Sequence, residues 1–421
     1  MKSTFYALAL SFMGLSSSAF AQNFNLALDN TRATPGKQCA TMEVLKAQMA
    51  ADPSLAKRMA AVEEQTRAFE ANLAAKGKGA VGGVVTIPVV VHVLYNTAAQ
   101  NVSDTQVRAQ IDVLNKDFAK ANSDANLVPS AFAGLAANTN IQFALAQQDP
   151  TGASTGGILH VQTKVSSFST NDAVKNSKRG GDDAWPASQY LNLWVCNLGG
   201  GLLGYAQFPG GTAKTDGVVV LYSSLPGGSA IPYDKGRTAT HEVGHWLNLR
   251  HIWGDASCGN DLVNDTPTQQ TSNYGCPTYP HVTCNNQGDM SMNYMDYTDD
   301  ACMYMFSVGQ SARMNAVFGA GGSRASLLSS PGATAPRQLA TASQAQVRLY
   351  PNPATQTLNV SVPEKQATTW SVKVYDLSGY EMKQARYDGQ GRVTVASLPQ
   401  GLYQVVMSDG QQTIRQRFQK D

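Results

Sequence analysis

HEVGHWLNLRH, residues 241–251, combines three metal ligands with a general base. His241 and His245 are four positions apart, so on an α-helix they lie on one face and can bind one ion. Glu242 lies beside them, where its carboxylate can take a proton from an attacking water, and His251 adds a third imidazole. Structural zinc sites are usually closed by a fourth protein ligand, whereas three histidines leave a position for water. The stretch therefore indicates a catalytic zinc site.

The helix that carries the first two histidines must end before His251, because six more helical residues would rotate that side chain away from the metal. Asn248 is the expected turning point, since asparagine tolerates the left-handed backbone conformation best after glycine. For the remaining three histidines we expect ordinary hydrogen-bonded roles: His92, His160 and His281.

A methionine follows downstream in the segment NYMDY, residues 293–297. In metzincin peptidases the motif HExxHxxGxxH is followed by a tight turn that carries a methionine below the zinc. Met295 is suited to that place, although a methionine is also a common core residue. Together with the histidine stretch it favours a metzincin-like fold.

Three segments resemble the pappalysin family of metzincin metallopeptidases: HEVGHWLNLRHIWGD at 241–255, DTP at 265–267 and NYMDYTDDAC at 293–302. The similarity extends over about residues 84–320, and Asn248 replaces the metzincin glycine. The resemblance implies an α/β (α+β) metzincin domain with zinc in a cleft between two subdomains. It also implies a zinc endopeptidase in which Glu242 is the general base.

The resemblance assigns roles to two residues after the methionine. Tyr297 is implied to lie near the zinc and to donate a hydrogen bond to the oxyanion, the alternative being an aromatic that packs in the turn. Asp300 matches a position that lines the pocket for the residue after the cut. A carboxylate there favours Lys or Arg, so we expect cleavage on the amino side of these residues. A solvated loop charge is the alternative for Asp300.

Four cysteines lie in the glycine-, asparagine- and proline-rich segment after the zinc motif, and four cysteines permit three pairings. The resemblance implies the pairs Cys258–Cys284 and Cys276–Cys302. A zinc cluster is the rival interpretation, but the usual CxxC pairs are absent. The same segment carries oxygen ligands for which the resemblance implies Ca²⁺, although alone they are ordinary turn residues: Asp261, Asn264, Asp265 and Thr266.

The N-terminal region predicts export and latency. Residues 1–21 have the basic start, apolar run and small-x-small ending of a signal peptide. Residues 22–80 are rich in helix formers and end in a glycine-rich linker, which predicts a helical propeptide. Within it, Cys39 resembles the family's cysteine switch, in which a thiolate takes the open zinc position. The alternatives are a stray thiol or a partner for Cys196. Basic residues near the linker are plausible self-activation sites: Lys76 and Lys78.

The catalytic region, residues 81–322, begins with the β-branched run 84–94, typical of a central strand. A helix is expected over 103–118 with Ser103 as its cap. Further strands are expected at 141–146, 191–196 and 218–222.

A linker composition at residues 323–345 leads to a second region, 346–421, whose short alternating runs predict a small all-β sandwich. Strands are expected at 357–362, 371–377 and 402–407. The segments LYPNP, YDLSG and LPQGLY resemble the C-terminal sorting domain of the type IX secretion system. This implies export through the periplasm to the exterior or the cell surface. A carbohydrate-binding or adhesive module is the alternative.

A formal net charge of +2 and 15% charged residues show no basic stripe for nucleic acid, and no segment predicts a transmembrane helix. Two function classes remain: a secreted zinc endopeptidase, made as a latent zymogen and acting on proteins or peptides, and a cell-surface binding protein with an inactive metzincin-like domain. The intact ligand set and Glu242 favour the first.

Overall fold

A computed structural model describes residues 39–76, 83–335, 348–361, 370–376, 379–408 and 413–421. They belong to two compact units, Met1–Thr334 and Ala335–Asp421. The predicted signal peptide, residues 22–38 and 77–80 of the predicted propeptide (with Lys78), and residues 336–345 of the predicted linker lie outside the described residues.

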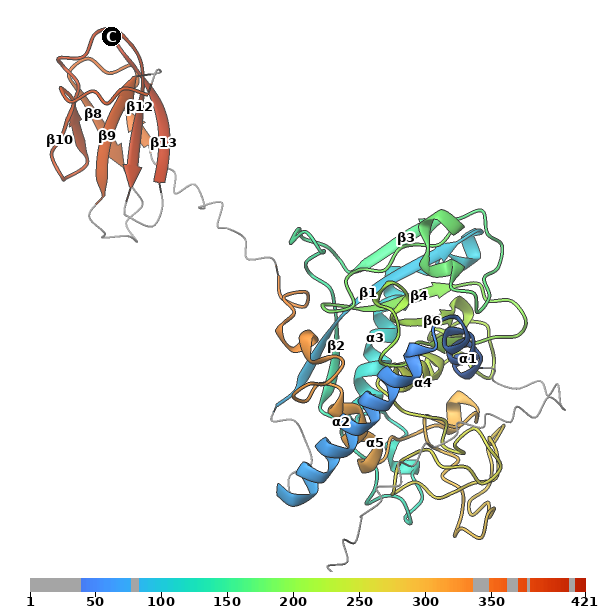
Figure 1. Cartoon of the computed structure of the whole chain (residues 1–421). Coiled ribbons are helices and arrows are strands. Elements are labelled where there is room, and N and C mark those ends of the chain that lie inside the picture. Colours follow the sequence, from blue (N-terminus) through green and yellow to red (C-terminus); the bar gives the residue numbers. More distant parts are fainter. Residues whose placement is uncertain (1–38, 77–82, 336–347, 362–369, 377–378, 409–412) are drawn as a thin grey trace, which may run out of the picture. The chain divides into compact units, whose positions relative to one another are not determined.

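The predicted propeptide helix is two helices, α1 (Thr41–Ala51) and α2 (Ser54–Lys76). Pro53 separates them, since proline lacks the N–H that a continuing helix needs. α2 packs against α5 (Val308–Ala316), where the buried Glu63 and Arg313 form an ion pair. The described part of the predicted propeptide therefore packs against the rest of the first unit (Figure 1).

A six-stranded sheet forms the frame of the first unit, in the order β2-β1-β4-β6-β5 with β3 also paired to β1. β1 runs parallel to its three partners, β4 runs parallel to β6, and only the edge strand β5 is antiparallel. The bounds are β1 Val85–Tyr95, β2 Ile141–Leu145, β3 Ile158–Gln162, β4 Leu191–Cys196, β5 Gly204–Ala206 and β6 Val218–Leu221. The four predicted strands are confirmed, whereas β3 and β5 were not predicted.

Two helices pack against the sheet and against each other, α3 (Asp104–Phe118) and α4 (Arg237–Trp246). The Ser103 hydroxyl caps α3 as predicted, since it accepts a hydrogen bond from the Gln106 N–H. The main hydrophobic core joins β1, α3, α4 and the segment around Met295. Beyond α4, residues 247–307 are mostly loop, which gives an α/β half followed by a loop-rich half (Figure 1).

The second unit consists of two antiparallel sheets, in the orders β10-β11-β8-β7 and β13-β12-β9, with a core of its own. This confirms the predicted all-β region. The bounds are β7 Arg348–Tyr350, β8 Thr357–Ser361, β9 Ser371–Asp376, β10 Arg386–Tyr387, β11 Arg392–Thr394, β12 Gly401–Ser408 and β13 Thr413–Lys420. Val362 and Leu377, the last residues of two predicted strands, lie outside the described residues.

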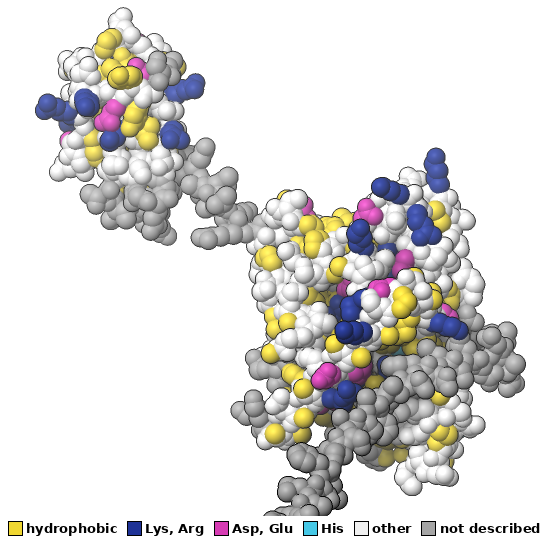
Figure 2. Space-filling model, viewed as in Figure 1, with side chains coloured by type: hydrophobic (Ala, Val, Ile, Leu, Met, Phe, Trp, Pro, Cys, Tyr) yellow, Lys and Arg dark blue, Asp and Glu magenta, His cyan; other side chains and the backbone are white. Residues whose placement is uncertain are grey.

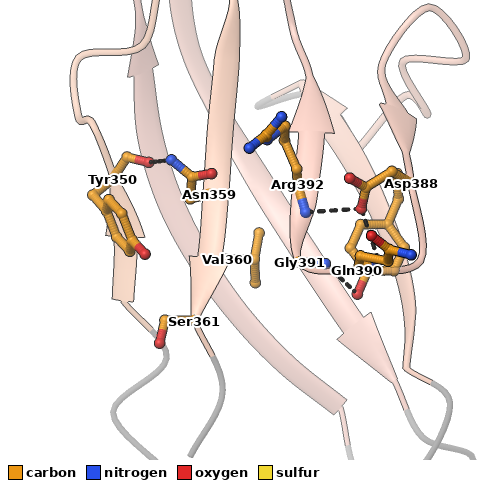
Figure 3. Close-up of a pocket in the computed structure, with 9 residues that line it drawn as sticks. Tyr350, Asn359, Val360, Ser361, Asp388, Gln390, Gly391 and Arg392 are labelled. Atoms are coloured by element: carbon orange, nitrogen blue, oxygen red, sulfur yellow. Dashed lines mark hydrogen bonds between the residues drawn. The ribbon is translucent and has the colours of Figure 1, made fainter.

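A polar pocket of about 510 Å³ lies on the four-stranded sheet, between Tyr350 and the turn that precedes β11 (Figure 3). The Asp388 carboxylate accepts hydrogen bonds from the Gln390 and Arg392 N–H groups and thereby holds that turn. On the face of the first unit seen in Figure 2, basic and acidic side chains are interspersed. Within the described part of the chain, no helix is both long and apolar enough to cross a membrane.

Candidate metal centre

The zinc motif adopts the expected helix and turn. α4 carries His241 and His245 and ends at Trp246. Asn248 then takes a φ of 76°, the left-handed conformation predicted for it, and the chain turns back to place His251 beside the other two imidazoles. The Arg313 guanidinium holds this turn, because its Nε donates to the Asn248 carbonyl at 2.8 Å.

The three imidazoles converge through their Nε2 atoms. The Nε2 atom of His245 lies 3.1 Å from those of His241 and His251. Each Nδ1 faces an acceptor: the Tyr294 carbonyl for His241, the Leu249 carbonyl for His245 and the Asp255 carboxylate for His251. The Nδ1 atoms therefore carry the protons, and three Nε2 lone pairs point at one spot. Tetrahedral zinc with bonds of about 2.0–2.1 Å suits this spacing, so the residues fit the metal.

The fourth member of this cluster is Cys39, the first residue of the predicted propeptide that the structure describes. Its Sγ and one nitrogen from each of the three histidines all lie within 4.8 Å of one another, and all four residues are buried. Cys39 and Cys196 are both free, so the alternative of a disulfide between them is wrong. Burial and the nearby Glu242 carboxylate raise the pKa of the Cys39 thiol well above its ordinary value. A thiolate at this place requires a nearby cation to stabilise its charge, and the three Nε2 lone pairs are placed to bind one.

Glu242 lies against the propeptide and the edge strand. Its Oε2 accepts a hydrogen bond from the Thr41 hydroxyl at 2.9 Å and lies 3.4 Å from the Cys39 Sγ. β5 approaches closely, since a Cβ on Gly204 would come within 2.8 Å of the Glu242 Cγ. Only glycine permits that approach, because any larger side chain at residue 204 would collide with the Glu242 side chain.

Met295 lies under the zinc helix, as its position after the motif predicted. A Cβ on Gly244 would meet the Met295 Sδ at 2.5 Å, so glycine at this helical position makes room for the methionine. Tyr297, two residues later, has its hydroxyl 3.0 Å from the His251 Nε2 and 3.4 Å from the Cys39 carbonyl. Burial raises the pKa of Tyr297 well above its ordinary value, so the phenol keeps its proton.

Two disulfides tie the segment after the zinc motif, Cys258–Cys284 and Cys276–Cys302. These are the pairs that the resemblance implied, and a cysteine zinc cluster is excluded. Asp300 is fully buried rather than solvated, and its Oδ2 accepts from the Lys235 and Arg237 N–H groups at 2.9 and 3.2 Å. Asp300 therefore also holds the start of α4.

The other two aspartates of that segment differ from each other. Asp296 is buried and accepts hydrogen bonds from the Gln269 amide, the Asn273 backbone and side chain, and the Tyr297 N–H. Burial raises the pKa of Asp296 to about 6. Asp299 is half-buried. Asp296 is therefore not a solvated loop charge, and its hydrogen bonds hold the methionine turn in place.

The residues expected to bind calcium lie in one loop but have other partners. The Asp261 carboxylate accepts from the Thr266 hydroxyl, and burial raises the pKa of Asp261 to about 6. The Asp265 carboxylate instead binds the Ser307 hydroxyl and the Gly309 N–H at the start of α5. Among the described residues, the cluster around Cys39 is the one group of three or more metal-binding side chains.

Several residues at the site were not predicted. Asp255 binds His251 at 2.5 Å, Trp253 stacks on the same imidazole with 4.4 Å between ring centroids, and Thr41 binds Glu242. The i,i+4 spacing of His251 and Asp255 was a usable signal for the first. His92, His160 and His281 are hydrogen-bonded elsewhere, as expected.

Comparisons with known proteins agree with this geometry. Residues 174–319 match the peptidase family M43, described as pregnancy-associated plasma protein-A, and residues 348–421 match the secretion system C-terminal sorting domain. An extracellular metalloprotease of Pyricularia oryzae is 34% identical over 260 residues, which cover 59% of this chain and 81% of that protein. Extracellular metalloprotease 1 of Coccidioides posadasii is 36% identical over 225 residues, 52% of this chain and 70% of that protein.

Solved structures are also similar. Mature mirolysin of Tannerella forsythia, in complex with a cleaved peptide, is 52% identical with a TM-score of 0.58, over 59% of this chain and 97% of that one. A promirolysin mutant is 46% identical with a TM-score of 0.62, over 69% of this chain and 96% of that one. An inactive binding protein is therefore not favoured. The chain belongs to the pappalysin family of peptidases: it is a secreted or cell-surface zinc metalloendopeptidase, made as a zymogen and carrying a type IX sorting domain.

Proposed function

We propose that this peptidase cuts peptide bonds on the amino side of Lys and Arg, with Glu242 as its general base and Cys39 as the ligand that keeps the zymogen latent. The observation that carries the proposal is the convergence of the three Nε2 atoms with the Cys39 Sγ, beside the buried Glu242 carboxylate.

The side chains around the metal suit peptide hydrolysis. When bound, zinc supplies a Lewis acid that polarises the scissile carbonyl and the attacking water. Glu242 takes the proton of that water and then passes it to the leaving amine. The Tyr297 phenol keeps its proton and lies 3.0 Å from a ligand nitrogen, so it is placed to donate to the carbonyl oxygen as negative charge develops there.

Latency follows from what the propeptide occupies. The Cys39 Sγ lies within 4.8 Å of a ligand nitrogen of each of the three histidines, so it would be the fourth ligand of a zinc ion held there. The Thr41 hydroxyl donates to the Glu242 Oε2 and accepts from the Ala206 N–H of β5 at 2.8 Å. The propeptide thereby engages both the metal site and the general base, the two groups that the attacking water needs.

The preference for basic residues rests on Asp300. Its carboxylate is buried in the loop-rich half, and the Cys276–Cys302 disulfide restrains the loop that carries it. A cationic partner stabilises the charge of a buried carboxylate, and a Lys or Arg side chain of the substrate would be such a partner.

One assay tests the activity and the preference together. The activated protein is incubated with a denatured protein mixture, with and without a zinc chelator, and the cut sites are mapped by mass spectrometry. We expect chelator-sensitive cuts with Lys or Arg directly after the cut, and no cuts from Glu242→Ala. Random residues after the cut would refute the role of Asp300. Full activity of Glu242→Ala would refute the base assignment.

Calcium in the loop that contains Asp261 and Asp265 stays part of the proposal. The buried Asp261 carboxylate, whose pKa is raised to about 6, is the kind of group that a nearby cation stabilises. A melting temperature of the chelator-treated protein that added Ca²⁺ leaves unmoved would count against this site.

A further inference from the structure

An aromatic side chain of the catalytic unit is covered by the propeptide. Phe208, two residues after β5, is only 3% exposed. The cluster of buried apolar residues around it consists otherwise of propeptide residues from α1 and α2: Met42, Leu45, Leu55 and Met59. Met49, which is partly buried, packs against the same cluster. Phe208 is thus buried against a segment that processing to a mature peptidase would remove.

Phe208 lies next to the metal site. Its ring meets that of the zinc-binding His245 edge-on, with 5.5 Å between the centroids. Its chain neighbours are also covered by the propeptide, since the Ala40 N–H donates to the Gly204 carbonyl, the Ala206 N–H to the Thr41 hydroxyl, and the Gln48 amide to Gln207. The propeptide therefore follows β5 and the loop after it, and Phe208 is the apolar member of that surface.

Loss of the propeptide leaves a large aromatic surface next to the reacting bond. Such a surface favours whatever apolar group next covers it, because burial of apolar area is favourable. In a peptidase the group that arrives beside the metal is a side chain of the substrate. The side chains that fill the place in the zymogen are leucines and methionines, which shows the size and shape that it accepts.

We propose that Phe208 forms the floor of an apolar subsite of the mature enzyme, which takes a leucine- or methionine-like side chain of the peptide substrate near the cut. Phe208 is then a specificity residue in addition to Asp300, and the enzyme recognises an apolar side chain of the substrate as well as a basic one. The inference rests on the proposed endopeptidase function.

The test compares matched peptides cut by the full-length protein after its propeptide has been removed by processing. All peptides carry the same cleavable bond before Arg, and Leu or Ser is placed in turn at each of the three positions on either side, the Arg position excepted. We expect one position at which Leu raises kcat/KM over Ser by about tenfold, as burial of a few methylene groups does in enzyme pockets. Phe208→Ser should bring that ratio close to one, and Phe208→Leu should keep most of it.

Two controls keep the outcome clear. Leu328→Ser alters a leucine that is 51% exposed in a short turn after α5 and should keep the wild-type ratio. Zinc content is measured for every variant, and if Phe208→Ser does not accumulate, Phe208→Trp should instead shift the preference from Leu to a smaller residue by narrowing the subsite.

The results separate this inference from the function beneath it. No cleavage of any peptide, or cleavage at bonds other than the one before Arg, contradicts the proposed function. Cleavage before Arg with equal rates for Leu and Ser at all positions overturns the subsite, as does a Leu preference that Phe208→Ser leaves intact. In that case Phe208 serves only to hold the propeptide.

Discussion

Hydrogen bonds to single residues set the protonation and the orientation of the three imidazoles at the metal site. All three zinc-binding imidazoles have an acceptor at Nδ1, and for His251 that acceptor is the Asp255 carboxylate at 2.5 Å. Trp253 lies flat on the same ring, with an interplanar angle of 8°. His251 follows a turn rather than the helix, so these two contacts fix an orientation that the backbone alone would not.

Asp255→Asn tests this positioning role. The amide keeps the size of the side chain but removes the charge that supports the His251 N–H, so we expect zinc affinity to fall by about 10–100-fold. Zinc retention against a competing chelator measures it. Asp112→Asn, on the exposed face of α3, is the matched control. Equal zinc retention by both variants would show that Asp255 is dispensable for the metal.

A second prediction concerns two neighbouring residues of the propeptide: Cys39 lies at the metal site and Thr41 hydrogen-bonds to Glu242. Cys39→Ala should give a proform with measurable peptidase activity, but Thr41 still engages Glu242 in that variant. Cys39→Ala combined with Thr41→Val should therefore be the more active. Initial rates are measured on proform shown by gel to be unprocessed. A Cys39→Ala proform as silent as the wild type would refute the cysteine switch.

Among the elements, α4 and the methionine turn approach each other closely at Gly244. Gly244 lies within α4, two residues before the helix ends, where helix propensity alone favours alanine. The close approach of the Met295 Sδ explains the glycine. Glycine at this position lowers the intrinsic stability of the helix but allows the helix to pack closely on the methionine turn.

Gly244→Ala should accordingly destabilise the protein by about 1–3 kcal/mol, as overpacking of a core does. Gly134→Ala is the control, because a Cβ at Gly134 would meet nothing within 4 Å. Chemical denaturation of the proforms compares the two. A Gly244→Ala protein as stable as Gly134→Ala would mean that Met295 has room to move aside.

On the scale of the whole molecule, catalysis and export belong to different units. The sorting domain has its own core of residues from both sheets, and the catalytic unit has another. Each unit can therefore be removed without opening the core of the other.

Deletion of residues 347–421 should leave a folded catalytic unit in the periplasm, because the removed part is the one that matches the sorting domain. Cell fractionation with an antibody to the catalytic unit measures the location, and zinc content of the purified truncated protein confirms its fold. Truncated protein in the culture medium would show that the tail is not needed for export.

Local patterns in the sequence were enough for much of the molecule. The zinc helix, the turn at Asn248, the cap of α3 and four strands of the main sheet follow from spacings of a few residues, which act through the geometry of one segment. β5 was missed because three residues carry no periodic signal, and β3 because its five residues are short and mostly half-exposed.

The sequence by itself was enough to predict the three metal ligands, the proposed general base and the order of the regions, because those predictions depend on side-chain chemistry at short spacing. Only the tertiary structure decided that Cys39 and Thr41 reach Glu242 across about 200 residues, that Asp300 holds the start of α4, and that the propeptide covers Phe208. Such contacts join segments far apart in the chain, and the packing of the whole fold selects them rather than any local preference.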